Sequence, residues 1–183
     1  MLDVKNMSLI ELQKELYNVA KEKGWHEEGN EKSHKECVIL TVSELCEALE
    51  HYRDGRELNE IFYSPEKPDK PDGISIELAD AKIRILDTMQ QLGMTAQDHI
   101  DYKCSVDYED MFGEHESFPD CLLTVISELT CAPVEQFTKE NLVLGLCYLE
   151  GLCKKFGIDI DQALSIKHEF NKTRPYRHGN KVV

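Results

Sequence analysis

The sequence predicts an all-α fold, and three observations lead to that prediction. Two stretches, 8–11 (SLIE) and 33–36 (SHKE), form capping boxes, in which a helix-starting serine precedes a glutamate by three residues. Apolar residues recur at helical spacing along much of the chain, whereas no segment shows a convincing strand pattern. The 183 residues, 41% of them hydrophobic, suit a single helical domain spanning 1–183 with one core.

The first half of the chain predicts three helices. Those that follow the capping boxes are expected over 9–23 and 34–53, because leucines, valines and alanines repeat there on one face. Residues 54–73 contain three prolines and two glycines, a composition typical of a loop. A third helix is expected over 76–92, where the apolar stripe is wider than in the first two.

The second half predicts an acidic loop followed by three more helices. Residues 98–120 carry eight acids against one basic residue, Lys103, which is typical of a solvated loop. Helical spacing returns over 120–131, 138–155 and 160–172. We therefore expect these helices to complete a bundle.

Charge and cysteine content narrow the classes of partner. With Lys+Arg 21 against Asp+Glu 35, the net charge is −14, so a nucleic-acid duplex or an anionic membrane surface is not an expected partner. The chain has seven scattered cysteines without a C-x-x-C pair, no signal peptide and no apolar run long enough to span a bilayer. These features predict reduced thiols and a cytoplasmic location, and they give little support to a zinc site.

Four acidic residues form two pairs with the same spacing. Glu44 and Glu47 lie three residues apart in the second helix, and Glu77 and Asp80 repeat that spacing in the third. Residues three apart share a helix face, and each pair is expected at the edge of the apolar stripe. If the two helices pack antiparallel, the four carboxylates converge, and all-oxygen ligation favours Mg²⁺, with Mn²⁺ as a second choice. The alternative is that both pairs simply face water.

Other polar residues could complete a site for a phosphorylated ligand. Lys167, Asn171 and Arg174 follow helical spacing, and their side chains suit phosphate oxygens. Alternatively, the basic residues complement the dipole of the last helix. Trp25 could stack on a base, although a single tryptophan after a helix is more often part of a core. His51 is expected near the acids, where it could support a ligand.

Three stretches taken together resemble the motifs of the MazG-like nucleotide pyrophosphohydrolases, in the same order. They are VSELCEALEHYRDGR (42–56), KPDGISIELADAKIRILD (70–87) and KHEFNKTRPYRHGNK (167–181). The resemblance covers about 35–92 and 148–181. It implies an all-α fold and Mg²⁺-dependent hydrolysis of a nucleoside triphosphate to the monophosphate and pyrophosphate by a metal-activated water. It also implies a homodimer or homotetramer.

The resemblance further implies a role for each matched residue. The metal ligands would be the four acids, and the phosphate contacts would come from the C-terminal residues: Glu44, Glu47, Glu77 and Asp80, then Lys167, Asn171 and Arg174. We expect Glu47 to be the base that helps to activate water, although spacing does not separate it from Glu44.

The sequence departs from the family pattern in two places. Ser43 stands where the family often has the first of two adjacent glutamates, which leaves the number of ions open. Residues 94–147 are an insertion relative to compact members. Two alternatives to the hydrolase remain: a helical nucleotide-binding or sensing module with little or no turnover, and a pyrophosphohydrolase that acts on a phosphoribosyl nucleotide.

Overall fold

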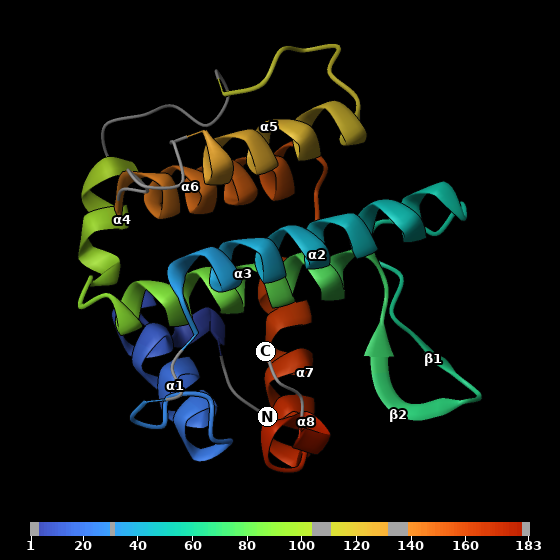
Figure 1. The fold of residues 1–183 in the computed structure, drawn as a ribbon. Helices are drawn as coiled ribbons and strands as arrows, with labels where there is room; N and C mark the ends of the chain where they lie inside the picture. Colours follow the sequence, from blue (N-terminus) through green and yellow to red (C-terminus); the bar gives the residue numbers. More distant parts are fainter. Residues whose placement is uncertain (1–3, 30–31, 104–110, 132–138, 181–183) are drawn as a thin grey trace.

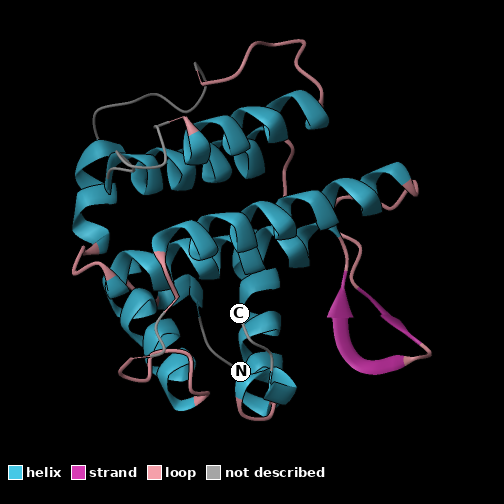
Figure 2. Ribbon diagram, viewed as in Figure 1, coloured by secondary structure: helices cyan, strands magenta, loops and turns pink. Residues whose placement is uncertain are grey.

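The computed structural model describes residues 4–29, 32–103, 111–131 and 139–180. Most of these residues are helical, and the regular β-structure among them is one small antiparallel hairpin (Figures 1 and 2). The predicted helical class is therefore confirmed. Within the described part of the chain, no helix combines the length and the apolar character needed to cross a bilayer.

The elements follow one another in a simple order. The first half contains a 3-10 turn η1 (Val4–Asn6), α1 (Leu9–Glu22), α2 (His34–Arg53), β1 (Phe62–Ser64), β2 (Lys67–Asp72) and α3 (Ile74–Gln91). The second half contains α4 (Ala96–Lys103), α5 (Phe118–Thr130), α6 (Lys139–Lys155), α7 (Ile160–Thr173) and a short turn α8 (Arg177–Asn180). Each of the six predicted helices is present, with ends within two residues of those expected.

Both predicted capping boxes start their helices. At α1, the backbone N–H of Ser8 donates to the Glu11 carboxylate and the N–H of Glu11 donates to the Ser8 hydroxyl. Ser33 and Glu36 repeat this exchange at α2. These bonds satisfy backbone donors that the first helical turn leaves free.

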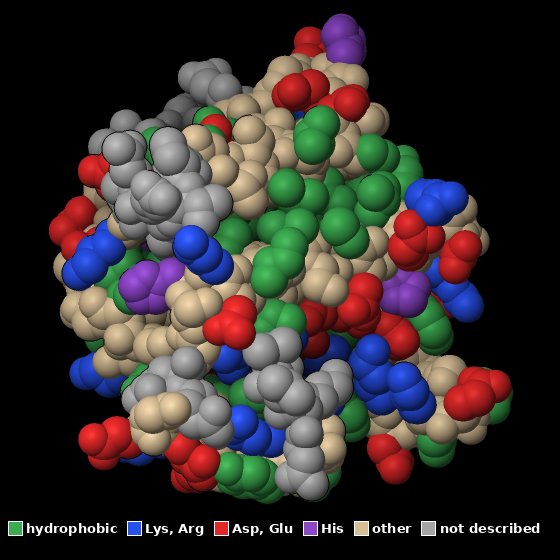
Figure 3. Space-filling view, viewed as in Figure 1, with side chains coloured by type: hydrophobic (Ala, Val, Ile, Leu, Met, Phe, Trp, Pro, Cys, Tyr) green, Lys and Arg blue, Asp and Glu red, His purple; other side chains and the backbone are tan. Residues whose placement is uncertain are grey.

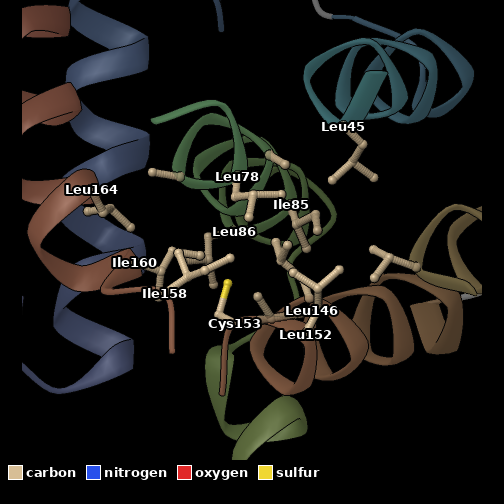
Figure 4. Close-up of a cluster of buried hydrophobic side chains, with 14 of the residues drawn as sticks. Leu45, Leu78, Ile85, Leu86, Leu146, Leu152, Cys153, Ile158, Ile160 and Leu164 are labelled. Atoms are coloured by element: carbon tan, nitrogen blue, oxygen red, sulfur yellow. The ribbon is translucent and has the colours of Figure 1, made fainter. Parts of the chain in front are cut away.

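Helix α3 is the central element of the fold. Twelve of its 18 residues are buried, because α2, α1, α6 and α7 all pack on it (Figure 1). Figure 4 shows side chains of α2, α6 and α7 converging on Leu78, Ile85 and Leu86 of α3. Helix α5 packs on α6 and also contacts α2, and α5 and α6 form a further layer above α2 and α3 in the view of Figure 1.

A mostly buried polar network joins α3 to α4 and α6. The Lys82 ammonium of α3 lies 3.1 Å from the Glu150 carboxylate of α6, whose other oxygen is 3.2 Å from His99 Nε2 of α4. The second ring nitrogen of His99 lies 3.2 Å from Cys147 Sγ. His99 and Cys147 are fully buried and Glu150 is only slightly exposed, so this network belongs to the core.

Two expectations about loops were wrong. The predicted loop 54–73 contains the hairpin, in which Phe62 pairs with Asp72 and Tyr63 pairs with Pro71. A two-stranded hairpin has only edge strands, so its prolines remove no interior hydrogen bond. In the predicted acidic loop, residues 96–103 form α4, while 104–110 lie outside the described residues.

Six cysteines lie in the described residues, and no disulfide joins them: Cys37, Cys46, Cys121, Cys131, Cys147 and Cys153. Cys104 lies outside the described residues.

Gly73 sets the point at which α3 begins. It precedes the first helical residue with φ +132°, a value that side chains rarely adopt, and a Cβ there would collide with the carbonyl oxygen of Glu60. The Gly73 N–H donates to the Asp72 carboxylate at 3.1 Å. This contact ties the end of the hairpin to the start of the central helix.

We expect Gly73→Ala to lower the free energy of unfolding by about 3 kcal/mol, because backbone strain and the clash with Glu60 add together. Gly55→Ala is the matched control, since Gly55 also has a positive φ (+76°) but no atom lies near its added Cβ. The free energy of unfolding of this control should fall by only about 1 kcal/mol. Urea unfolding followed by circular dichroism measures both, and equal losses would contradict the assigned role of Gly73.

Candidate functional site

A pocket of about 540 Å³ opens between α1, α2, α3, α7 and the hairpin. Its volume is within the range of small-molecule sites. Acidic and basic side chains lie next to one another on this face in Figure 3. The charged and polar lining includes Glu44, Glu47, Lys70, Glu77, Asp80, Arg84, Lys167, Asn171 and Arg174.

The structure brings three of the four predicted metal ligands together. One carboxylate oxygen each from Glu44, Glu77 and Asp80 lies within 4.8 Å of the other two. Such spacing allows a common ion. Glu47 lies one turn further along α2, where it is exposed; it lines the same pocket but is not a member of this group.

The two glutamates of this group are more deeply buried than expected. Glu77 is 1% exposed and Glu44 is 7% exposed, although the sequence placed both at the edge of an apolar stripe. The difference arises because helices cover α3 on most sides and because Thr41, Glu44 and Ala48 lie on the buried face of α2. The position of the leucines and valines alone therefore does not show where the buried face of α2 is centred.

Neither carboxylate oxygen of Glu77 has a hydrogen-bond partner among the described residues. The nearest cations are the ammonium groups of Lys70, 3.6 Å away, and Lys167, 3.9 Å away. Burial raises the pKa of Glu77 to about 9; the negative charge of Asp80 and a hydrogen bond that the protonated Glu77 can give to Asp72 add to this rise, and the two lysines oppose it. A buried carboxylate without a partner is costly, so the environment of Glu77 fits a bound cation.

The other two acids are paired with basic side chains of the same chain. Arg84 contacts Glu44 through two nitrogens, at 2.6 and 2.8 Å. Lys167 Nζ lies 2.7 Å from Asp80. Burial by itself would lower the pKa of Lys167, but Asp80 and Glu77 outweigh it and hold the pKa above its usual value. Lys167 is therefore a charged group directed at the acids.

The remaining predicted binding residues also line the pocket. Asn171 and Arg174 follow Lys167 on the same side of α7, and Asn171 Oδ1 is buried without a hydrogen-bond partner in the described part of the chain. Trp25 lines the pocket too but is only 9% exposed, and the Lys32 ammonium lies 4.0 Å from its ring centroid. Trp25 is thus both a core residue and a wall of the pocket.

Sequence reasoning missed Lys70 and Asp72, which come from β2. Both were assigned to an irregular loop, where no periodicity fixes the direction of a side chain. Their proximity to the start of α3 could have indicated a role. The sequence also gave no indication that Arg84 of α3 would pair with Glu44 of α2.

Comparison of the chain with protein-family models, with curated proteins and with solved structures found no match. The site itself combines carboxylates, which bind hard cations, with Lys167, Arg84 and Arg174, which bind phosphate oxygens. This combination is suited to a ligand that carries both a divalent cation and phosphate groups.

The buried state of Glu77 predicts how stability depends on pH. Because its pKa is about 9 in the folded chain, Glu77 keeps a proton that the unfolded chain loses above its ordinary value of 4.5. The metal-free protein should therefore lose stability from about pH 5 to pH 9. The free energy of unfolding of Glu77→Gln should equal that of the wild type near pH 5 and exceed it by about 2 kcal/mol near pH 9. Urea unfolding at each pH measures this difference.

Two controls accompany this measurement. Glu50→Gln removes an exposed acid from α2 and should leave the pH profile unchanged. Added Mg²⁺ should stabilise the wild type near pH 8 but not Glu77→Gln. If the free energy of unfolding of the wild type and of Glu77→Gln depended on pH in the same way, the prediction would be wrong. Glu77 would then be ionised in the folded chain even without a bound cation.

Proposed function

We propose that this chain hydrolyses a nucleoside triphosphate to the monophosphate and pyrophosphate in a Mg²⁺-dependent reaction. The motifs that resemble the MazG-like pyrophosphohydrolases support this activity. The observation that carries the proposal is the buried Glu77 carboxylate. It has no hydrogen-bond partner among the described residues, and it lies with Glu44 and Asp80 beside three basic side chains whose types suit phosphate.

Glu44, Glu77 and Asp80 would hold the ion. A bound Mg²⁺ neutralises phosphate charge and lowers the pKa of water at the site. The protein supplies the fixed positions: Glu77 and Asp80 lie one turn apart on α3, which is held by packing on most sides, and Glu44 faces them from α2. Such positioning contributes much of the acceleration when no covalent intermediate is formed.

Glu47 is the better candidate for the base. It is exposed and lines the pocket, so its carboxylate can reach a water molecule that enters from solvent. Glu44 is buried and already bonded to Arg84 at 2.6 and 2.8 Å. Because Glu44 would also hold the ion, its carboxylate is less free than that of Glu47 to bond to an entering water molecule, which favours Glu47 for this role.

Lys167, Arg84 and Arg174 would stabilise the charge of the phosphate groups and of the leaving pyrophosphate. Asn171 would donate a hydrogen bond from its amide. In the ligand-free chain Lys167 and Arg84 are paired with Asp80 and Glu44. Binding of a metal–phosphate complex therefore exchanges partners: the acids turn to the ion and the cations turn to phosphate.

The proposed activity is tested by pyrophosphate release from a panel of nucleoside and deoxynucleoside triphosphates with Mg²⁺. We expect release from at least one of them. Asp80→Asn should lower kcat/KM by at least about 100-fold while leaving the helical content intact. The control Glu50→Gln should keep the wild-type rate, because Glu50 is exposed and pairs with Arg53.

Other outcomes of this assay have definite meanings. Tight nucleotide binding without pyrophosphate release would contradict the hydrolase proposal and favour a nucleotide-sensing module. Release only from a phosphoribosyl nucleotide would identify the biosynthetic alternative. Unchanged turnover of Asp80→Asn would contradict the assigned site.

The exchange of partners predicts cooperative binding. Mg²⁺ and a slowly hydrolysed α,β-imido triphosphate should each raise the affinity for the other, because each releases the side chains that the second ligand needs. Calorimetric titrations in both orders should give the same enhancement, of about tenfold or more. Independent binding of the two ligands would contradict the exchange.

A further inference from the structure

A second group of candidate ligands lies beside the first, on the side of Glu77 that faces the hairpin. It brings together His51 of α2, Asp72 at the end of β2 and Glu77 of α3, with one ligand atom of each within 4.8 Å of the others. His51 Nε2 lies 2.8 Å from the Asp72 carboxylate. Because the three residues belong to three elements, the fold rather than helical spacing brings them together.

The two oxygens of Glu77 face different groups. Oε1 lies 3.6 Å from the ammonium of Lys70, which is also 3.7 Å from the Asp72 carboxylate. Oε2 lies 3.9 Å from the ammonium of Lys167, which pairs with Asp80. Each group therefore has one lysine ammonium close both to an oxygen of Glu77 and to a second carboxylate of that group, Asp72 in one case and Asp80 in the other.

The ammonium of Lys70 does not satisfy the carboxylate that it faces. A distance of 3.6 Å is beyond a hydrogen bond, and Glu77, at 1% exposure, cannot bond to water instead. The Lys70 side chain is 25% exposed and belongs to the hairpin. The Lys70 ammonium can therefore move into solvent, and a divalent metal ion can then bind beside Glu77 and Asp72.

We propose that His51, Asp72 and Glu77 bind a second divalent cation, a first-row transition metal such as Mn²⁺. An imidazole nitrogen favours such ions over Mg²⁺, whereas the group of Glu44, Glu77 and Asp80 offers only oxygen. Glu77 gives one oxygen to each ion. That bridging role rests on the proposed Mg²⁺ site, but the His51 site itself does not.

The test counts Mn²⁺ bound to the metal-free full-length chain, from the electron paramagnetic resonance signal of the free ion. The wild type should bind two ions without Mg²⁺ and one ion in a large excess of Mg²⁺. Asp80→Asn should keep the Mg²⁺-resistant ion and lose the other. If excess Mg²⁺ displaces all Mn²⁺ from the wild type, the proposal is wrong.

His51→Phe removes the nitrogen ligand and preserves an aromatic ring against Phe62, whose centroid lies 5.4 Å from that of His51. This variant should lose the Mg²⁺-resistant ion and keep the one that Mg²⁺ displaces. His34→Phe is the matched control, since His34 is an exposed histidine of the same helix, and it should bind as the wild type does. Retention of the resistant ion by His51→Phe would overturn the proposal.

Lys70→Met should strengthen Mn²⁺ binding, whereas His51→Phe should weaken it. This second test does not depend on whether the His51 variant folds. Removing an ammonium that lies within 4 Å of two ligands should tighten binding of the Mg²⁺-resistant Mn²⁺ at least about tenfold. Unchanged or weaker binding would count against the site. Pyrophosphate release with Mg²⁺ alone is measured separately, so either the hydrolase proposal or the second site can fail without the other.

Discussion

The burial of a single carboxylate is the constraint on which the site depends. Glu77 lies on the most enclosed helix of the protein, where an uncompensated negative charge is unfavourable. The surrounding residues lessen that cost but do not remove it: two lysines approach without forming hydrogen bonds, and the pKa of the group rises. The core thus contains a carboxyl group that is stable with a proton and that, as we propose, can exchange this proton for a bound cation.

The charges of the pocket show how such a position can exist in a stable protein. Asp80 and Glu44 are neutralised by Lys167 and Arg84, each of which comes from a different helix than the acid it pairs with. These acids and cations thus form internal ion pairs. With the proposed metal–phosphate ligand, the same side chains would separate into a cation-binding half and an anion-binding half. Under this proposal, folding and binding use the same charges in two different pairings.

Much of this arrangement was predictable from the sequence, and the reasons for the failures are physical. Capping boxes and apolar spacing located the helices because local hydrogen bonds and one-sided burial act over a few residues. The same reasoning placed Glu44 and Glu77 at an edge, because periodicity cannot tell how many neighbours cover a helix. His51 of α2 lies near the acids as expected, but the approach of Lys70 and Asp72 depends on a short hairpin within a proline-rich stretch. No local pattern records which way its side chains point.

The buried network of Lys82, Glu150, His99 and Cys147 has a consequence for the opposite side of α3. A helix packed only by leucines and isoleucines can slide or turn to equivalent positions, whereas buried polar groups keep their bonds in one arrangement. A slip of α3 by one residue would turn it by about 100° and break the contact with Glu150. Helices α4 and α6 therefore fix the rotation of the central helix from the side opposite the pocket, and this rotation directs its acids into the pocket.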